Sequence, residues 1–129
     1  MSQKKCVLSI GQCRPDQAAI THLLTTNYDV DVLTADLRQT ANELLKQRTV
    51  DLVLVNRKLD ADYSDGMEII KDILGADLPQ RPAVMLVSNF PEWQDKAVAM
   101  GALRGFGKAE LNSAETRAKL SALLAGEGK

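Results

Sequence analysis

Residues 51–56 read Asp51-Leu52-Val53-Leu54-Val55-Asn56, a stretch in which every position between the two polar ends is apolar. A strand covered on both faces shows such a continuous apolar run, whereas a half-exposed strand alternates between apolar and polar residues. Strands of this kind belong to parallel sheets with helices on both sides. The stretch therefore predicts a central strand of a parallel sheet, flanked along the chain by alternating helices and strands.

The segments before residue 51 alternate in this way. An apolar run at residues 6–10 ends at Gly11 and predicts a first strand, and Ile20, Leu23 and Leu24 then follow at helical spacing. Residues 30–33 partly alternate, as a strand with one exposed side does. The apolar positions 37, 41, 44 and 45 then repeat as on one face of a helix. Two strand–helix pairs thus precede the central strand.

The segments after residue 56 continue the pattern. A polar loop at 57–66 leads to a third helix with apolar positions 67, 70 and 74. An apolar run at 83–87 predicts a fourth strand, and Trp93, Ala97 and Met100 mark the next helix. A short strand is predicted at 103–106, and Asn112-Ser113-Ala114-Glu115 has the form of a capping box for the last helix. The polar tail, residues 126–129, is expected to be frayed.

Strict alternation of five predicted strands and five predicted helices defines the expected architecture. It is an α/β fold with a doubly wound five-stranded parallel sheet, flavodoxin-like with strand order 2-1-3-4-5, and with helices on both faces. No linker, internal repeat or second core is apparent. All 129 residues are therefore read as one domain.

The amino-acid composition argues against several classes of function. Sixteen basic and seventeen acidic residues leave a net charge of -1 without any block of like charge, so nucleic acid is not an expected partner. No run approaches the roughly 18 apolar residues of a membrane span, so we expect a cytoplasmic protein that does not bind membranes. Cys6, Cys13 and His22 do not make a zinc-ligand set, and both thiols are expected to be reduced.

The predicted architecture indicates where a ligand-binding site should lie. In doubly wound sheets the ligand binds beyond the carboxyl ends of the strands, where the strand order reverses. The predicted strands end at Gly11 and Gln12, at Asn56, at Ser88 and near Lys108. These residues are expected to converge.

The same positions carry a resemblance to the receiver domains of response regulators. Short motifs of that family occur here in the same order along the chain. Residues 51–56 precede an acidic loop that ends in Asp65-Gly66, and Ser88 follows the apolar residues 84–87. Gly101-Ala102 then precedes the predicted fifth strand, and Lys108 follows it. The resemblance covers nearly the whole chain. It implies a signal-transduction domain of a two-component or phosphorelay-type system.

The resemblance also implies that the usual chemistry is lost. Receivers take a phosphoryl group onto an aspartate at the end of the third strand, with Mg²⁺ held by acidic residues at the end of the first. Asn56 stands at the first of these positions, and an amide cannot attack phosphorus. Gly11 and Gln12 stand at the acidic pair, and Mg²⁺ needs carboxylate or phosphate oxygens. We therefore expect a pseudo-receiver that is not an enzyme, has no cofactor and binds Mg²⁺ weakly or not at all.

The residues that would transmit a signal to a partner also differ from those of the family. Gly105 occupies the position of the family's switch aromatic, which the adjacent Phe106 could partly replace, and Ala109 stands where a proline usually follows the lysine. Receivers meet partners through the fourth helix, fifth strand and fifth helix. The expected partner is thus a protein, such as a kinase, regulator or output domain. Trp93 and Met100 could be core residues or part of such a docking patch.

Several alternatives remain open at this stage. Lys108 could form an anion pocket with Ser88 and the backbone near Gly11; otherwise it bonds strand-end carbonyls or Asn56, or faces solvent. Asp60 could be a displaced phosphoacceptor, although the loop aspartates are more simply solvated turn residues. A small-ligand-binding flavodoxin-like domain is a further possibility.

Overall fold

The structure, a computed structural model, describes residues 4–78 and 80–124, so the tail predicted to fray lies outside the described residues. The described elements alternate between strand and helix as predicted. They are β1 (Lys5–Ile10), α1 (Arg14–Asn27), β2 (Val30–Ala35), α2 (Arg38–Gln47), β3 (Leu52–Asn56), α3 (Gly66–Gly75), β4 (Ala83–Val87), α4 (Pro91–Met100), β5 (Leu103–Phe106), the 3-10 turn η1 (Lys108–Glu110) and α5 (Ala114–Leu124).

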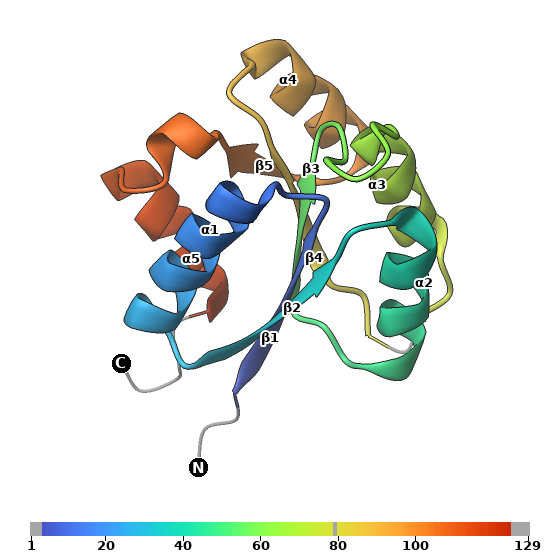
Figure 1. Cartoon of the computed structure of the whole chain (residues 1–129), viewed down its shortest axis with the longest axis horizontal. Helices are drawn as coiled ribbons and strands as arrows, with labels where there is room; N and C mark the ends of the chain where they lie inside the picture. Colours follow the sequence, from blue (N-terminus) through green and yellow to red (C-terminus); the bar gives the residue numbers. More distant parts are fainter. Residues whose placement is uncertain (1–3, 79, 125–129) are drawn as a thin grey trace.

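The described strands form one parallel sheet in the order β2-β1-β3-β4-β5, which confirms the predicted topology. Helices α1 and α5 cover one face, and α2, α3 and α4 cover the other (Figure 1). The carboxyl ends of the strands lie together at the upper edge of the sheet in this view. The strand order reverses between β1 and β3 there, where the candidate site is expected.

The position of β3 in the sheet explains why its residues 52–55 are all apolar. Leu52 and Leu54 belong to the core cluster beneath α1 and α5, whereas Val53 and Val55 belong to the cluster beneath α2, α3 and α4. All four side chains are fully buried. Because successive side chains of a strand point to opposite faces, a strand covered on both sides must be apolar at every position.

The structure corrects the predicted start of α5 and shows where Met100 and Trp93 of α4 lie. The hydroxyl of Ser113 accepts a hydrogen bond from the Thr116 N–H (3.1 Å), so α5 is capped one residue later than the predicted box that begins at Asn112. Met100 is exposed and does not join the core. Trp93 is half-buried, with the Arg57 guanidinium 3.8 Å from its ring centroid, and so it packs within the chain.

A close backbone approach fixes the start of α3. Gly66 is the first residue of this helix, and a Cβ at that position would run into the carbonyl oxygen of Asn56. The side chain of Asp65 caps the helix by accepting from the Met67 N–H (2.9 Å). The glycine therefore lets α3 begin directly against the end of β3, which holds the backbone of Asn56 in place.

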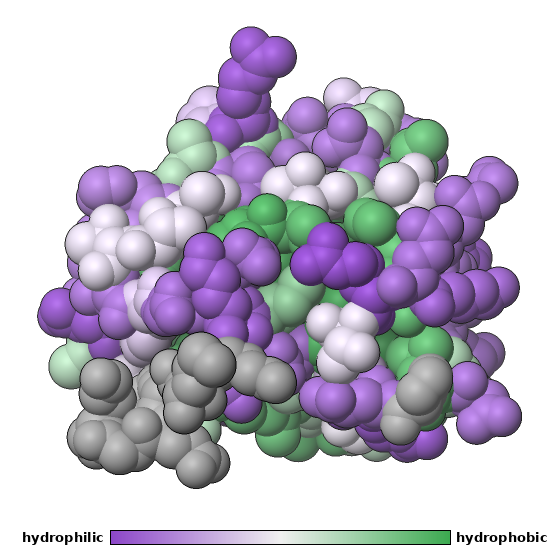
Figure 2. Space-filling view, turned by 90° about the horizontal axis from the view of Figure 1, so that it is seen from below, coloured by the Kyte–Doolittle hydropathy of each residue, from purple (hydrophilic) through white to green (hydrophobic). Residues whose placement is uncertain are grey.

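Figure 2 looks onto the lower end of the molecule as drawn in Figure 1, where hydrophilic residues frame hydrophobic residues in the middle of the face. Within residues 4–78 and 80–124, no helix combines the length and the apolar character that a membrane span requires.

Candidate functional site

Asn56 ends β3 with its side chain turned toward β1. Its amide nitrogen Nδ2 donates a hydrogen bond to the Gly11 carbonyl (2.9 Å), and only 9% of the residue is exposed. An aspartate could not make this bond in its ionised form, because a carboxylate only accepts. The asparagine is thus a structural donor in this fold.

Gly11 provides the acceptor because of its unusual backbone. Its φ of 76° lies in the left-handed region that favours glycine. The Gly11 carbonyl accepts both the Asn56 amide and the Asp60 N–H (2.9 Å). Its own N–H donates to the Ala35 carbonyl (2.8 Å) and so is not available to an anion. Gly11 therefore ties β1 to β2, to β3 and to the loop that follows β3.

Gln12 folds back over β1 instead of reaching toward Asn56. Its Nε2 makes a long contact with the Ile10 carbonyl (3.4 Å), and only 7% of the residue is exposed. Its Oε1 is buried without a hydrogen-bond partner among the described atoms. The two positions that resemble an acidic pair thus bring a carbonyl and a neutral amide to this edge of the sheet.

Among the described residues, Lys108 bonds an aspartate and not a strand-end carbonyl or Asn56. Its Nζ forms an ion pair with Asp16 Oδ2 at 2.8 Å, and the same oxygen accepts from the Cys13 thiol (3.1 Å). The hydrogen bond from Lys108 holds the pKa of the Asp16 carboxyl below its usual range. Asp16, in the first turn of α1, therefore supplies the lysine with a carboxylate that the sequence reasoning did not identify.

This ion pair predicts a pH-dependent contribution to stability. Asp16→Asn should lower the free energy of unfolding at neutral pH by about 0.5 kcal/mol, because both side chains are partly solvated. A lowered pKa in the folded state means that the contribution exists above about pH 4, the ordinary aspartate value, and disappears as the pH falls through the Asp16 pKa. Urea unfolding at neutral and acid pH measures this difference.

Asp77→Asn, which changes an exposed carboxylate in the loop after α3, is the matched control and should show no such dependence. Equal stability of Asp16→Asn and the unmodified chain at neutral pH would mean that the pair contributes nothing.

A pocket of about 260 Å³ lies at the ends of β3, β4 and β5 and includes Asn56, Ser88 and Lys108 in its lining. The remaining lining residues are Arg57, Lys58, Val87, Asn89 and Phe90. The Ser88 hydroxyl accepts from the Phe90 N–H (3.2 Å). Three of the predicted site residues therefore converge, but Gly11 is not in this lining. Its wall carries three cationic side chains and no carboxylate, a set that does not fit Mg²⁺, but Lys108 is paired with Asp16 and Arg57 with Asp65 (3.4 Å).

The β4–β5 pairing contains a feature that sequence reasoning missed. The register shifts between Met85 and Val87, and the buried side chain of Gln94 is inserted at that point. Its Oε1 accepts from the Gly105 N–H (2.9 Å), and its Nε2 donates to the carbonyls of Leu86 (2.9 Å) and Ser88 (3.1 Å). Gln94 thus satisfies backbone groups that the shifted ladder leaves unpaired.

Gly105 is a structural requirement of this arrangement. A Cβ there would run into the Leu86 carbonyl oxygen, so position 105 cannot hold a side chain in this backbone. Phe106, considered above as a partial replacement, is buried in the core cluster beneath α1 and α5. On the outer side of β5, the Lys119 Nζ donates to the Gly105 carbonyl (2.9 Å).

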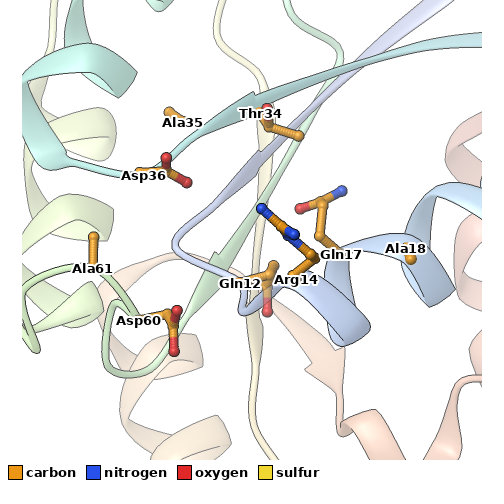
Figure 3. A pocket seen from close by; sticks show the side chains of 9 residues that line it. All are labelled: Gln12, Arg14, Gln17, Ala18, Thr34, Ala35, Asp36, Asp60 and Ala61. Carbon is orange, nitrogen blue, oxygen red and sulfur yellow. The ribbon is translucent and has the colours of Figure 1, made fainter.

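The loop after β3 is folded on itself. The Asp62 carboxylate accepts from the backbone N–H and the hydroxyl of Ser64 (2.9 and 2.6 Å), and these bonds lower the pKa of Asp62. Asp65 caps α3. Asp60 is exposed and lines a different cavity, with Gln12 (Figure 3). Within the described ranges, no group of three or more His, Cys, Asp or Glu side chains is placed to hold a metal ion.

The sheet order and the polar pocket at the strand ends define a class: a doubly wound flavodoxin-like domain with a site at the carboxyl edge of its sheet. Neither a family model nor a curated protein matches the sequence.

Solved structures do match. The signal receiver domain of the DNA-binding response regulator merR from Colwellia psychrerythraea superposes with a TM-score of 0.78, at 21% identity over 93% of this chain and 98% of that one. The BeF3-activated receiver domain of Klebsiella pneumoniae RstA gives a TM-score of 0.73, at 22% identity over 95% and 99%. A response regulator from Thermotoga maritima gives 0.73, at 21% identity over 92% and 97%. The chain therefore has the fold of response-regulator receiver domains.

Proposed function

We propose that this chain is a pseudo-receiver of a two-component or phosphorelay-type system, one that cannot be phosphorylated and acts by binding another protein. The observation that carries the proposal is the hydrogen bond from Asn56 Nδ2 to the Gly11 carbonyl. It places a neutral donor where receivers need a nucleophilic carboxylate, and it uses that donor to join β3 to β1.

Two further contacts support the proposal. Lys108, the residue that meets the phosphoryl group in receivers, is held by Asp16. Gly105 is packed against the Leu86 carbonyl and bonded to Gln94, which leaves no room for the aromatic side chain of the family's switch. The positions for attack, for phosphoryl binding and for switching thus all have structural contacts of their own. On this proposal the domain has no enzymatic activity, holds no cofactor and binds Mg²⁺ poorly.

The partner is proposed to be a protein, such as a kinase, regulator or output domain. The α4–β5 part of the expected docking face exposes Val98, Met100 and Leu103, with 45% of Leu103 accessible. Exposed apolar residues of this kind can form the apolar centre of a protein interface. We also propose that the protein is cytoplasmic.

Phosphorylation by acetyl phosphate tests the proposal directly. After incubation with acetyl phosphate and Mg²⁺, intact-mass analysis should show no added phosphoryl group, whereas a receiver that retains its aspartate should gain one. A hydroxylamine-labile gain would contradict the proposal. If Asp60→Asn abolished that gain, Asp60 would be the acceptor and the domain a conventional receiver with a displaced site.

The polar pocket at Lys108 remains a predicted anion site. Titration with sulfate or phosphate should move the backbone NMR signals of Lys58, Ser88 and Lys108, because these residues line it. Gly11 should move less, since its N–H is already bonded to Ala35. Unchanged signals at Ser88 and Lys108 would exclude the site.

A further inference from the structure

A second and larger cavity, of about 500 Å³, lies where α1, the end of β2 and the loop after β3 meet. None of its lining residues lines the pocket at Asn56. We call it the Arg14 cavity, after the residue that Figure 3 shows projecting into it. It lies at the carboxyl edge of the sheet, the end at which folds of this class place their ligands.

Charges of both signs face this cavity without pairing. Arg14 comes from the first turn of α1, Asp36 follows β2, and Asp60 belongs to the loop after β3. In Figure 3 the Arg14 guanidinium and the Asp36 carboxylate project toward the space between them. Among the described residues, none of the three takes part in an ion pair. The cavity wall therefore carries one cation and two anions that have no ion-pair partner among residues 4–78 and 80–124.

The rest of the lining restricts the chemistry of a ligand. The apolar surface comes from Ala18, Ala35 and Ala61, and no aromatic ring lines the cavity in the described part of the chain. A flavin or a nucleobase would lack a stacking partner here, whereas a short aliphatic chain would fit. The buried Gln12 amide adds an Oε1 acceptor with no donor near it. Its last torsion is soft in glutamine and could turn that oxygen toward a ligand.

We propose that the Arg14 cavity binds a free amino acid with a second cationic group, of the kind represented by lysine, ornithine or arginine. Its carboxylate would pair with the fork of Arg14, which suits planar anions. Its two cationic groups would pair with Asp36 and Asp60. A purely anionic ligand would meet two carboxylates, and a simple diamine would leave Arg14 unpaired. One negative and two positive charges complement this wall.

A ligand bound in the Arg14 cavity would affect the pocket at Asn56 through the shared contacts of Gly11. The Asp60 N–H and the Asn56 amide donate to the same Gly11 carbonyl, each at 2.9 Å. A ligand that held Asp60 would therefore stabilise the loop that shares this acceptor. The binding site does not rest on the proposed function, because its test in the unmodified chain does not depend on whether Asn56 or any other residue can be phosphorylated.

Titration of the whole chain, labelled with ¹⁵N, with L-lysine tests the proposal. We expect the backbone signals of Gln12, Arg14, Asp36 and Asp60 to shift at millimolar lysine. L-Norleucine, which lacks the second ammonium, and cadaverine, which lacks the carboxylate, should bind at least tenfold more weakly. Absence of shifts at these residues with lysine overturns the site. Norleucine or cadaverine binding as tightly as lysine overturns the assigned charge pattern.

Single substitutions test separately the recognition of the ligand's carboxylate and of its ammonium groups. Arg14→Gln and Asp36→Asn should each weaken lysine binding at least tenfold. Arg48→Gln and Asp77→Asn remove an exposed charge of the same sign outside the cavity lining and should leave binding unchanged. Because all four positions are exposed, the variants should fold. Lysine binding that survives Arg14→Gln and Asp36→Asn would overturn the proposal.

Discussion

Replacing Asn56 by aspartate is expected to destabilise the fold and still leave it unphosphorylated. The substitution removes the donor to Gly11 and points a buried carboxylate at a carbonyl oxygen. An unsatisfied buried group of this kind costs on the order of 3 kcal/mol. Because domains of this size have about 5–15 kcal/mol of stability, the variant should remain folded at neutral pH.

The pH dependence of Asn56→Asp follows from the same contact. In the folded state the new carboxyl should have a raised pKa, because only its protonated form can donate to Gly11 as the amide does. The stability difference from the unmodified chain should therefore shrink in acid and be largest at neutral pH. Urea unfolding across this pH range measures it.

Asn89→Asp is the matched control for this variant. The Asn89 side chain accepts from the Ala109 N–H (3.1 Å), a role that a carboxylate oxygen can also fill, so this change should cost little. For Asn56→Asp, intact mass after acetyl phosphate and Mg²⁺ should show no adduct, since Gly11 and Gln12 provide no metal-binding carboxylates. Efficient labelling, or stability equal to that of the unmodified chain, would show that the Asn56 contact has been misinterpreted.

Gly105→Ala is expected to have an effect at least as large, even though it adds a single methyl group. The new Cβ would meet the Leu86 carbonyl oxygen, which belongs to the backbone of β4 and cannot turn aside as a side chain could. Relief requires β5 to move away from β4, which would break the bond from the Gly105 N–H to Gln94 Oε1. Overpacking of this severity costs about 3 kcal/mol or more.

Gly75→Ala provides the control for Gly105→Ala. Gly75 is the last residue of α3, and a Cβ there would meet nothing within 4 Å. Since alanine favours helix over glycine, this change should be neutral or stabilising by up to about 1 kcal/mol. Thermal unfolding of the two variants should therefore differ in sign or strongly in size. A Gly105→Ala protein as stable as the Gly75→Ala protein would refute the proposed close contact.

The fold could be predicted because its determinants are local patterns. The apolar residues of β3, the strand–helix alternation and the breaker Gly11 each act within a short window of sequence. Helix boundaries were less secure, since Asn112 and Ser113 both look like caps and only the three-dimensional path selects Ser113.

The site was only partly predictable for a different physical reason. The convergence of Asn56, Ser88 and Lys108 follows from topology alone. The partners of their side chains do not, because they depend on distances between elements far apart in sequence. Asp16 is 92 positions from Lys108, and nothing local distinguishes it from an ordinary first-turn acid. Gln94 similarly looks like a surface residue of an amphipathic helix until the register shift of β5 is known.

The bond from Lys119 to the Gly105 carbonyl affects how this molecule can associate with others. Gly105 belongs to β5, an edge strand, and free carbonyl groups along such an edge invite the addition of a strand from another chain. Lys119 occupies one of these acceptors from α5 and places a positive charge beside it. An incoming strand would have to displace the lysine. Addition of a strand at this side of the molecule should therefore be disfavoured at Gly105.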